Sequence, residues 1–259
     1  MVKKWLSQAY LALIFLFLYA PIAVLIIFSF NDSKSTGHWA GFSLRWYQDL
    51  IQDSRMQAAI STTIAIAIIA TVIATIVGTL TAIGIYKLTK KTKAFVLNVN
   101  YLPVISPEIV IAIGLMMLYR SLGFNFGFVT MLLAHIMFCT PYVVLSVLPR
   151  LYAMNPNMVE AAMDLGATPM QAIRKVVIPE IKPGILAGAL IAFTMSIDDF
   201  VISYFNTGNG VSNLSIEVYS MARRGILPTV NALATIMVAL VLFTVLSVNK
   251  LTLKNKKEV

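Results

Sequence analysis

The chain is built from long apolar runs separated by short segments that hold most of its charged residues. A transmembrane helix needs about 20 consecutive apolar residues. Four runs of sufficient length contain no charged residue, namely 6–30, 58–86, 127–149 and 229–249. Two further runs contain acidic residues, namely 94–119 and 183–204. The pattern therefore predicts an all-α, polytopic membrane protein with six transmembrane helices.

The predicted helices leave no separate soluble domain, so residues 1–259 are expected to form a single transmembrane domain. Lys3 and Lys4 precede the first run, as basic residues precede the apolar part of a signal peptide. This run is longer than such an apolar part, and no small-x-small cleavage pattern follows Phe30. We therefore expect it to be retained as a helix. Residues 150–182 are expected to form a loop before the fifth helix.

The composition agrees with a membrane protein, because 59% of the residues are hydrophobic and only 12% are charged. A net charge of +9 would suit nucleic-acid binding only if the basic residues gathered on one folded face. They lie between the apolar runs instead, so we expect membrane lipid and no nucleic acid as a partner. The single cysteine, Cys139, cannot form a disulfide within the chain.

Basic residues are distributed unequally between the two sides that six helices define. The N-terminus, 87–93, 150–182 and the segment from Lys250 onward hold 14 of the 20 Lys and Arg residues, and the opposite side holds six. Cytoplasmic loops carry the excess of basic residues in membrane proteins. Both termini and the 150–182 loop are therefore predicted to be cytoplasmic.

Two prolines interrupt the third apolar run, at Pro103 and Pro107. Proline breaks a helix because it lacks the backbone N–H, but it suits the first helical position. We expect the helix to end here and to restart with Ser106 as N-cap, Pro107 at the first position and Glu108 in the first turn.

The 150–182 loop carries helix punctuation of its own. Asn155 followed by a proline at the first helical position predicts the start of one helix, and Gly166 in the left-handed conformation predicts its end. Thr168 and the proline after it predict the start of a second helix. The loop is therefore expected to contain two short helices.

The same loop resembles a known signature. Glu160, Ala161 and Ala162, then Gly166 six residues after the glutamate, then the Val176–Pro179 segment follow the pattern of the permeases of type I ABC importers. The resemblance implies the fold of that family. It also implies that Glu160, Ala161, Ala162 and Gly166 belong to a coupling helix that docks on a cytoplasmic ATPase.

Nearly the whole chain is similar to the second permease of spermidine/putrescine importers. The sequence departs from that branch at two positions: Glu108 takes the place of an expected aspartate, and Ile197 takes the place of an expected methionine. The matching stretches are Gly41–Tyr47, Ser106–Val110, Phe193–Asp199 and Asn231–Thr235. The resemblance implies a polyamine as cargo and an inner-membrane location.

The sequence has no P-loop, HExxH pattern, paired cysteine motif or GxSxG motif, so it shows no means of hydrolysing ATP. The resemblance implies that partners supply this energy. We expect the chain not to be an enzyme and to bind no cofactor or metal. ATP would be bound by an ATPase dimer. A second homologous permease would complete a heterodimer, and a periplasmic polyamine-binding protein would deliver the cargo.

Three acidic residues within the apolar runs need an explanation, since a charge in the middle of a membrane costs about 2.5 to 3.5 kcal/mol. Glu108 lies 14 residues from Ala94, and Asp198 lies 14 residues from Gly184. Both acids are thus about 21 Å from the cytoplasmic start of their helices, at one level. The residues predicted to line the path of a cationic cargo are Glu108, Asp198, Asp199, Trp46 and Ser196.

Each of these residues also has a structural interpretation. Glu108 is favoured by the dipole of a restarted helix. Asp198 and Asp199 are about 100° apart on a helix, so one of them would bond to partner backbone instead. Trp46 would anchor at the membrane interface if it makes no cation–π contact with the cargo. His135 is expected to hydrogen-bond between helices.

Two other functions fit the same pattern. The loop signature covers importers of several kinds of cargo, although three unpaired acids argue against anions. A proton-coupled carrier or cation channel would use Glu108, Asp198 and Asp199 as its ion path.

Overall fold

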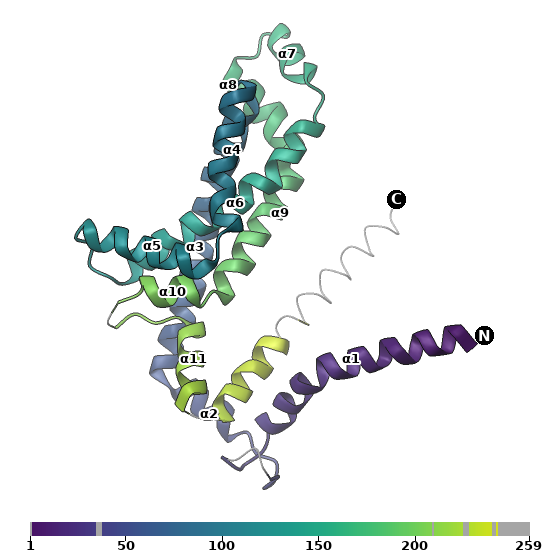
Figure 1. The fold of residues 1–259 in the computed structure, drawn as a ribbon, viewed down its shortest axis with the longest axis vertical. Coiled ribbons are helices and arrows are strands. Elements are labelled where there is room, and N and C mark those ends of the chain that lie inside the picture. The colour runs from purple at the N-terminus through teal and green to yellow at the C-terminus, as the bar shows by residue number, and fades with distance from the viewer. Residues whose placement is uncertain (1, 35–37, 209, 225–227, 240–241, 243–259) are drawn as a thin grey trace. The chain divides into compact units, whose positions relative to one another are not determined.

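The structure is a computed structural model that describes residues 2–34, 38–208, 210–224, 228–239 and 242. The described residues are predominantly helical, with one isolated antiparallel bridge between Asn31 and Phe42. They divide into two compact units, Met1–Gln57 with Val218–Val259, and Ala58–Glu217. Figure 1 labels the helices in chain order.

The first unit contains α1 (Val2–Ser29), α2 (Arg45–Gln52) and the apolar helix Pro228–Ala239. The large apolar side chains of α1 between Tyr10 and Ile27 are mostly exposed, as suits a helix in lipid. Asn31 closes the turn after α1, because its amide donates to the His38 carbonyl and its side-chain oxygen accepts from the Ala40 N–H, both at 2.8 Å.

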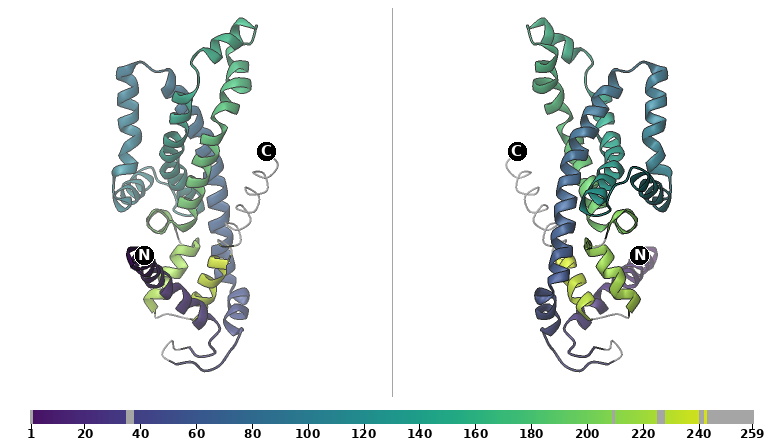
Figure 2. Two further views of the ribbon diagram at one scale, coloured as in Figure 1. Left: turned by 90° about the vertical axis from the view of Figure 1, so that its right-hand side faces the viewer. Right: turned by 90° about the vertical axis from the view of Figure 1, so that its left-hand side faces the viewer.

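The second unit is a bundle around the paired helices α6 and α9, with α4 beside them and α7 at the end away from α10 (Figures 1 and 2). Its core consists mainly of apolar side chains from α3, α5 and α6, with further ones from η1, α9 and α10. The helices are α3 (Ser54–Lys87), α4 (Lys90–Ile105), α5 (Glu108–Ser121), α6 (Phe128–Ala153), α7 (Asn157–Asp164), α8 (Pro169–Ala172), the π-helix η1 (Ile173–Val177), α9 (Ile178–Asp198), α10 (Val201–Asn206) and the start of α11 (Leu214–Arg224).

Small residues let α9 approach α6 closely. Gly184, Gly188 and Ala192 repeat every four residues and are buried, so they form one stripe on α9. A Cβ atom on Gly184 would lie 2.9 Å from the carbonyl oxygen of Ser146, and one on Gly188 would lie 3.1 Å from the Cα atom of Val143. Small residues at this spacing are typical of closely packed transmembrane helices.

Lys93 joins three helices of the bundle. Its ammonium group donates to the Tyr86 carbonyl at 3.0 Å and lies over the rings of Tyr86 and Tyr152, at 5.7 and 5.3 Å. These residues come from α4, α3 and α6. A lysine that covers two rings in this way contributes a cation–π contact of about 0.5–1 kcal/mol at an exposed site.

The predicted break in the third apolar run is present at Pro107, with two corrections. Pro103 does not interrupt the helix, because it lies inside α4, which continues to Ile105. The helices α4 and α5 meet at an angle of 106°. Ser106 ends α4 with ψ 143°, since a residue before proline is driven to extended backbone. Pro107 is also extended, with ψ 133°, so α5 begins at Glu108 and the Ser106 side chain caps nothing. The expected restart was therefore placed one residue too early.

The expected fifth helix, 183–204, differs from the structure at both ends. Helical structure is continuous from Pro169 to Asp198, because η1 joins α8 to α9 without a turn. The second loop helix is thus the start of the long helix, not a separate element. Asp199 then takes extended backbone with ψ 128°, which ends the helix before Tyr204. Two residues later the chain forms α10.

Four described helices are long and apolar enough to cross a membrane, and the bent pair α4–α5 makes up to five. The sixth predicted span, 229–249, coincides in part with the apolar helix Pro228–Ala239. Its remainder lies almost wholly outside the described residues, so the count of six stays a prediction.

Candidate functional site

Three acids from separate parts of the second unit line one cavity of about 350 Å³. Glu108 begins α5, Asp198 ends α9 and Asp199 follows it. The other lining residues are Phe138, Met195, Phe200 and Val201. The bend between α4 and α5 and the break after α9 thus bring Glu108 together with an acidic pair some 90 residues away in the sequence.

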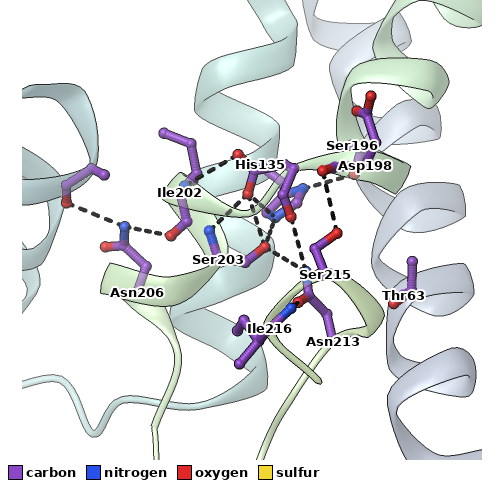
Figure 3. A network of polar contacts seen from close by, with 12 residues as sticks. Thr63, His135, Ser196, Asp198, Ile202, Ser203, Asn206, Asn213, Ser215 and Ile216 are labelled. Carbon is purple, nitrogen blue, oxygen red and sulfur yellow. Dashed lines mark hydrogen bonds and ion pairs between the residues drawn. The ribbon is translucent and has the colours of Figure 1, made fainter. Parts of the chain in front are cut away.

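Glu108 and Asp198 are the accessible acids of this cavity. Both residues are exposed, and neither carboxylate forms an ion pair within the described parts of the chain. The backbone carbonyl of Asp198 accepts a hydrogen bond from the Ser215 hydroxyl at 3.2 Å, while its carboxylate points away from the neighbouring polar network (Figure 3). Two negative groups therefore face the cavity without a compensating cation.

Asp199 is placed differently, because its side chain is only 3% exposed. One carboxylate oxygen accepts from the Ile202 N–H at 3.1 Å. The other accepts from the Ser203 N–H at 2.7 Å and the Ser203 hydroxyl at 2.9 Å. A carboxylate in this position satisfies the first N–H groups of α10, which have no partner within the helix. Asp199 therefore fixes the backbone between the end of α9 and the start of α10.

His135 connects α6 to this break. Its Nδ1 atom lies 2.7 Å from the Ser196 hydroxyl, and its Nε2 atom lies 2.9 Å from the Ser203 hydroxyl and 3.5 Å from an oxygen of Asp199. The expectation that His135 hydrogen-bonds between helices is confirmed. Ser196, predicted to line the path, is buried and bonds to His135 instead of opening to the cavity.

Two asparagines complete the network, and the sequence pattern did not point to either of them. Asn213 donates to the Ser203 hydroxyl at 2.7 Å and to the Asp199 carbonyl at 3.2 Å. Asn206 donates to the Ala112 carbonyl of α5 at 3.2 Å. An asparagine in an otherwise apolar stretch is a usable signal for such bonds, but its partners cannot be read from spacing.

Trp46 belongs to the first unit. It is 4% exposed, and its indole N–H donates to the Asn31 carbonyl at 2.6 Å. The guanidinium group of Arg45 lies over its ring at 5.1 Å. A cation of the chain itself thus occupies a cation–π position on the ring. Its assignment to the cargo path stays a prediction.

With this geometry in view, comparison with known proteins places the chain. Residues 74–254 match the family described as the inner membrane component of binding-protein-dependent transport systems. The chain belongs to this family. The predicted permease fold and the resemblance stated above are confirmed, and the family's location is the inner membrane.

Curated relatives resemble this permease over nearly its full length. It is 39% identical to the spermidine/putrescine transport system permease protein PotC of Haemophilus influenzae, which it matches over 98% of its own length and 99% of the relative. For PotC of Escherichia coli the identity is 38%, with 95% and 94% covered. For the putrescine transport system permease protein PotI of Escherichia coli the identity is 38%, with 88% and 83% covered.

A solved structure shares the permease fold. A bacterial ABC transporter involved in the import of the acidic polysaccharide alginate contains a chain that superposes with a TM-score of 0.74, over 97% of this permease and 96% of that chain. The sequence identity is 19%, so the likeness concerns the fold alone.

The loop predicted to couple the permease to an ATPase has the expected local structure. Pro156, just before α7, has helical φ and ψ of −60° and −29°, and the Asn155 side chain accepts from the Asn157 N–H at 3.0 Å, as expected of an N-cap. Gly166, at φ +86°, ends α7. The Ala167 N–H reaches the Ala162 carbonyl at 3.1 Å, as in a Schellman motif.

The surface of this loop is open within the described chain. Glu160 and Ala161 are exposed, Ala162 is half-buried, and Leu165 is 91% exposed. Thr168 accepts from the Gln171 N–H while the Gln171 side chain accepts from the Thr168 N–H, which forms a capping box at the start of α8. The long helix from Pro169 to Asp198 therefore joins this surface directly to the acidic cavity.

Another hollow suits a cation poorly. A space of about 790 Å³ in the first unit is lined by apolar residues of α1 and by Asn231. No group of three metal-ligating side chains occurs among the described residues.

Proposed function

We propose that this permease is a membrane subunit of an ATP-driven importer whose cargo is a polyamine such as spermidine or putrescine. The single observation that carries the proposal is the cavity at which Glu108 and Asp198 present carboxylates without cationic partners. Relatives at 38–39% identity are named for spermidine and putrescine transport, which supports the same cargo.

The cavity suits the chemistry of a polyamine. Such a molecule is a flexible chain of methylene groups with an ammonium group at each end. The carboxylates would neutralise ammonium groups, and a charged hydrogen bond of this kind contributes about 1.5–3 kcal/mol. Phe138 and Phe200 also line the cavity, and Met195 and Val201 add apolar surface for the methylene groups.

The energy for transport would come from a cytoplasmic ATPase dimer that docks on α7. The exposed Glu160, Ala161 and Leu165 provide the surface, and Gly166 provides the turn that presents it. Movement of the ATPase would be transmitted along the helix from Pro169 to Asp198, which at about 1.5 Å per residue is about 45 Å long.

An importer of this type would have two further partners. A second, homologous permease would form the other half of the path, and a periplasmic polyamine-binding protein would deliver the cargo. A solved neighbour is a bacterial alginate ABC transporter in complex with an alginate-loaded periplasmic protein. Both termini and α7 would lie in the cytoplasm, as the distribution of basic residues favours.

The test is polyamine uptake by cells whose native copy of this permease is replaced by variants. We expect Glu108→Gln and Asp198→Asn each to raise KM for spermidine about tenfold, because each removes one charged contact. The abundance of the complex in the membrane should not fall, since removing a charge from a membrane-spanning segment eases insertion. Glu180→Gln is the matched control, because Glu180 is exposed on the same long helix far from the cavity.

Two results test the energy source and the role of the acidic cavity. Uptake should stop when ATP is depleted while the proton gradient is kept, which separates an ATP-driven importer from a proton-coupled carrier. If Glu108→Gln combined with Asp198→Asn assembles normally and takes up spermidine at the wild-type rate, the acidic cavity does not bind the cargo.

A further inference from the structure

The hydrogen atoms of the buried network fix the direction of its bonds. Ser203 has one hydroxyl hydrogen, which it donates to Asp199 at 2.9 Å. Its oxygen must therefore accept from its other two neighbours, the Asn213 amide at 2.7 Å and His135 Nε2 at 2.9 Å. Nε2 thus carries hydrogen, and in an uncharged ring Nδ1 accepts from the Ser196 hydroxyl. Each group in this chain of bonds is thus assigned as a hydrogen-bond donor or acceptor.

This chain of bonds ends where the backbone turns. Asp199 has φ −61° and ψ 128°, which is extended backbone between α9 and α10. Asp198 is the last residue of α9, so the two neighbouring acids lie on either side of the end of this helix. The Asp199 carboxylate accepts from the Ser203 N–H of α10 and lies 3.5 Å from His135, whereas the Asp198 carboxylate lies away from this network (Figure 3). The orientation of Asp198 toward the cavity thus depends on where Asp199 is held.

We infer that His135 is a positioning residue: acting through Ser203, it holds Asp199 at the break between α9 and α10 and so directs the Asp198 carboxylate into the cavity. The inference rests on the proposed function and divides the acidic pair into two roles. Asp198 contacts the cargo, whereas Asp199 acts through the backbone. Ser196 belongs with Asp199, because its hydroxyl orients the imidazole ring.

Substitutions at His135 can separate its two hydrogen bonds. Glutamine places an amide near the Nε2 position and can still donate to Ser203. Asparagine places its amide near the Nδ1 position, so it can reach Ser196 but not Ser203. Leucine has similar bulk and makes neither bond. We therefore expect His135→Gln to preserve the position of Asp198, and His135→Asn and His135→Leu to disturb it.

The first experiment measures this position without any cargo. A cysteine at position 198 is labelled with a positively charged thiol reagent in the purified complex, and a chain with only the buried Cys139 gives the background. We expect the labelling rate to fall about fivefold with His135→Leu or His135→Asn, the factor for one lost hydrogen bond, and to stay near the parent rate with His135→Gln. Equal rates in all three variants would overturn the positioning role.

The second experiment measures spermidine uptake in a double-mutant cycle. If His135 acts through Asp198, His135→Leu should raise KM about as much as Asp198→Asn, and the double variant should be no worse than Asp198→Asn alone. Additive effects would contradict the inference, because a general loss of structure harms both backgrounds equally. In the chain that keeps Asp198, His135→Gln should give a KM for spermidine close to the wild-type value.

The two experiments separate this inference from the proposed function. If the cargo is not a polyamine, spermidine uptake is absent in every variant, while the order of labelling rates still follows the bonds that each residue at position 135 can make. If the cargo is a polyamine but His135 only fills space, spermidine uptake responds to Asp198→Asn and the labelling rates of the His135 variants are equal.

Discussion

The contact between α6 and α9 offers a sharp test of the structure, because a single methyl group is enough to disturb it. Gly184→Ala would place a Cβ atom 2.9 Å from the Ser146 carbonyl oxygen and 2.8 Å from the Cγ atom of Arg150. The arginine side chain can move aside, but a backbone oxygen in a helix cannot. The two helices must therefore separate by about half an ångström to regain van der Waals contact.

Inserting a methyl group into a packed interior costs about 1–3 kcal/mol. For a chain of this size, each kcal/mol shifts the midpoint of thermal unfolding by about 2–4 °C. We therefore expect Gly184→Ala to lower the midpoint of the detergent-solubilised complex by about 2–12 °C. Spermidine uptake should fall as well, because α9 carries Asp198 and the facing helix α6 carries His135.

The matched control is Gly84→Ala in α3, where an added Cβ atom has nothing within 4 Å in this chain. Alanine is the better helix former by about 1 kcal/mol, so this variant should be neutral or slightly more stable. Size-exclusion profiles recorded after heating would give both midpoints. Equal midpoints for the Gly184→Ala and Gly84→Ala complexes would show that α6 and α9 do not pack through this glycine.

Three further predictions concern the coupling loop, the membrane topology and Trp46. Gly166→Ala puts a side chain on backbone with φ +86°, which costs about 1–2 kcal/mol, and should reduce the ATPase that co-purifies; Gly123→Ala, with φ +73° outside the loop, bears similar strain and should retain it. A single cysteine at Asp164 should react from the cytoplasm and one at Lys34 from outside; the reverse labelling would invert the topology. Trp46→Phe loses the indole hydrogen bond and should lower stability by about 1 kcal/mol with KM for spermidine unchanged, whereas a raised KM would indicate contact with the cargo.

Local features of the chain were predictable because their physical causes are local. The α4–α5 break follows from Pro107, and the end of α7 follows from Gly166, since each residue restricts or frees its own backbone. The cap predicted at Ser106 was one residue too early. Several residues near a helix start can cap it, and the sequence does not say which one adopts the extended conformation.

The sequence by itself determined that the chain is an all-α membrane permease and that acids interrupt its apolar runs, because hydropathy and loop motifs can be read along the chain. Only the tertiary structure decided how Asp198 and Asp199 divide their roles. That division depends on His135, which lies 61 residues before Ser196 and 68 before Ser203. Contacts over such separations arise when α6 packs on α9 and α10, and the spacing of residues within one helix holds no information about them.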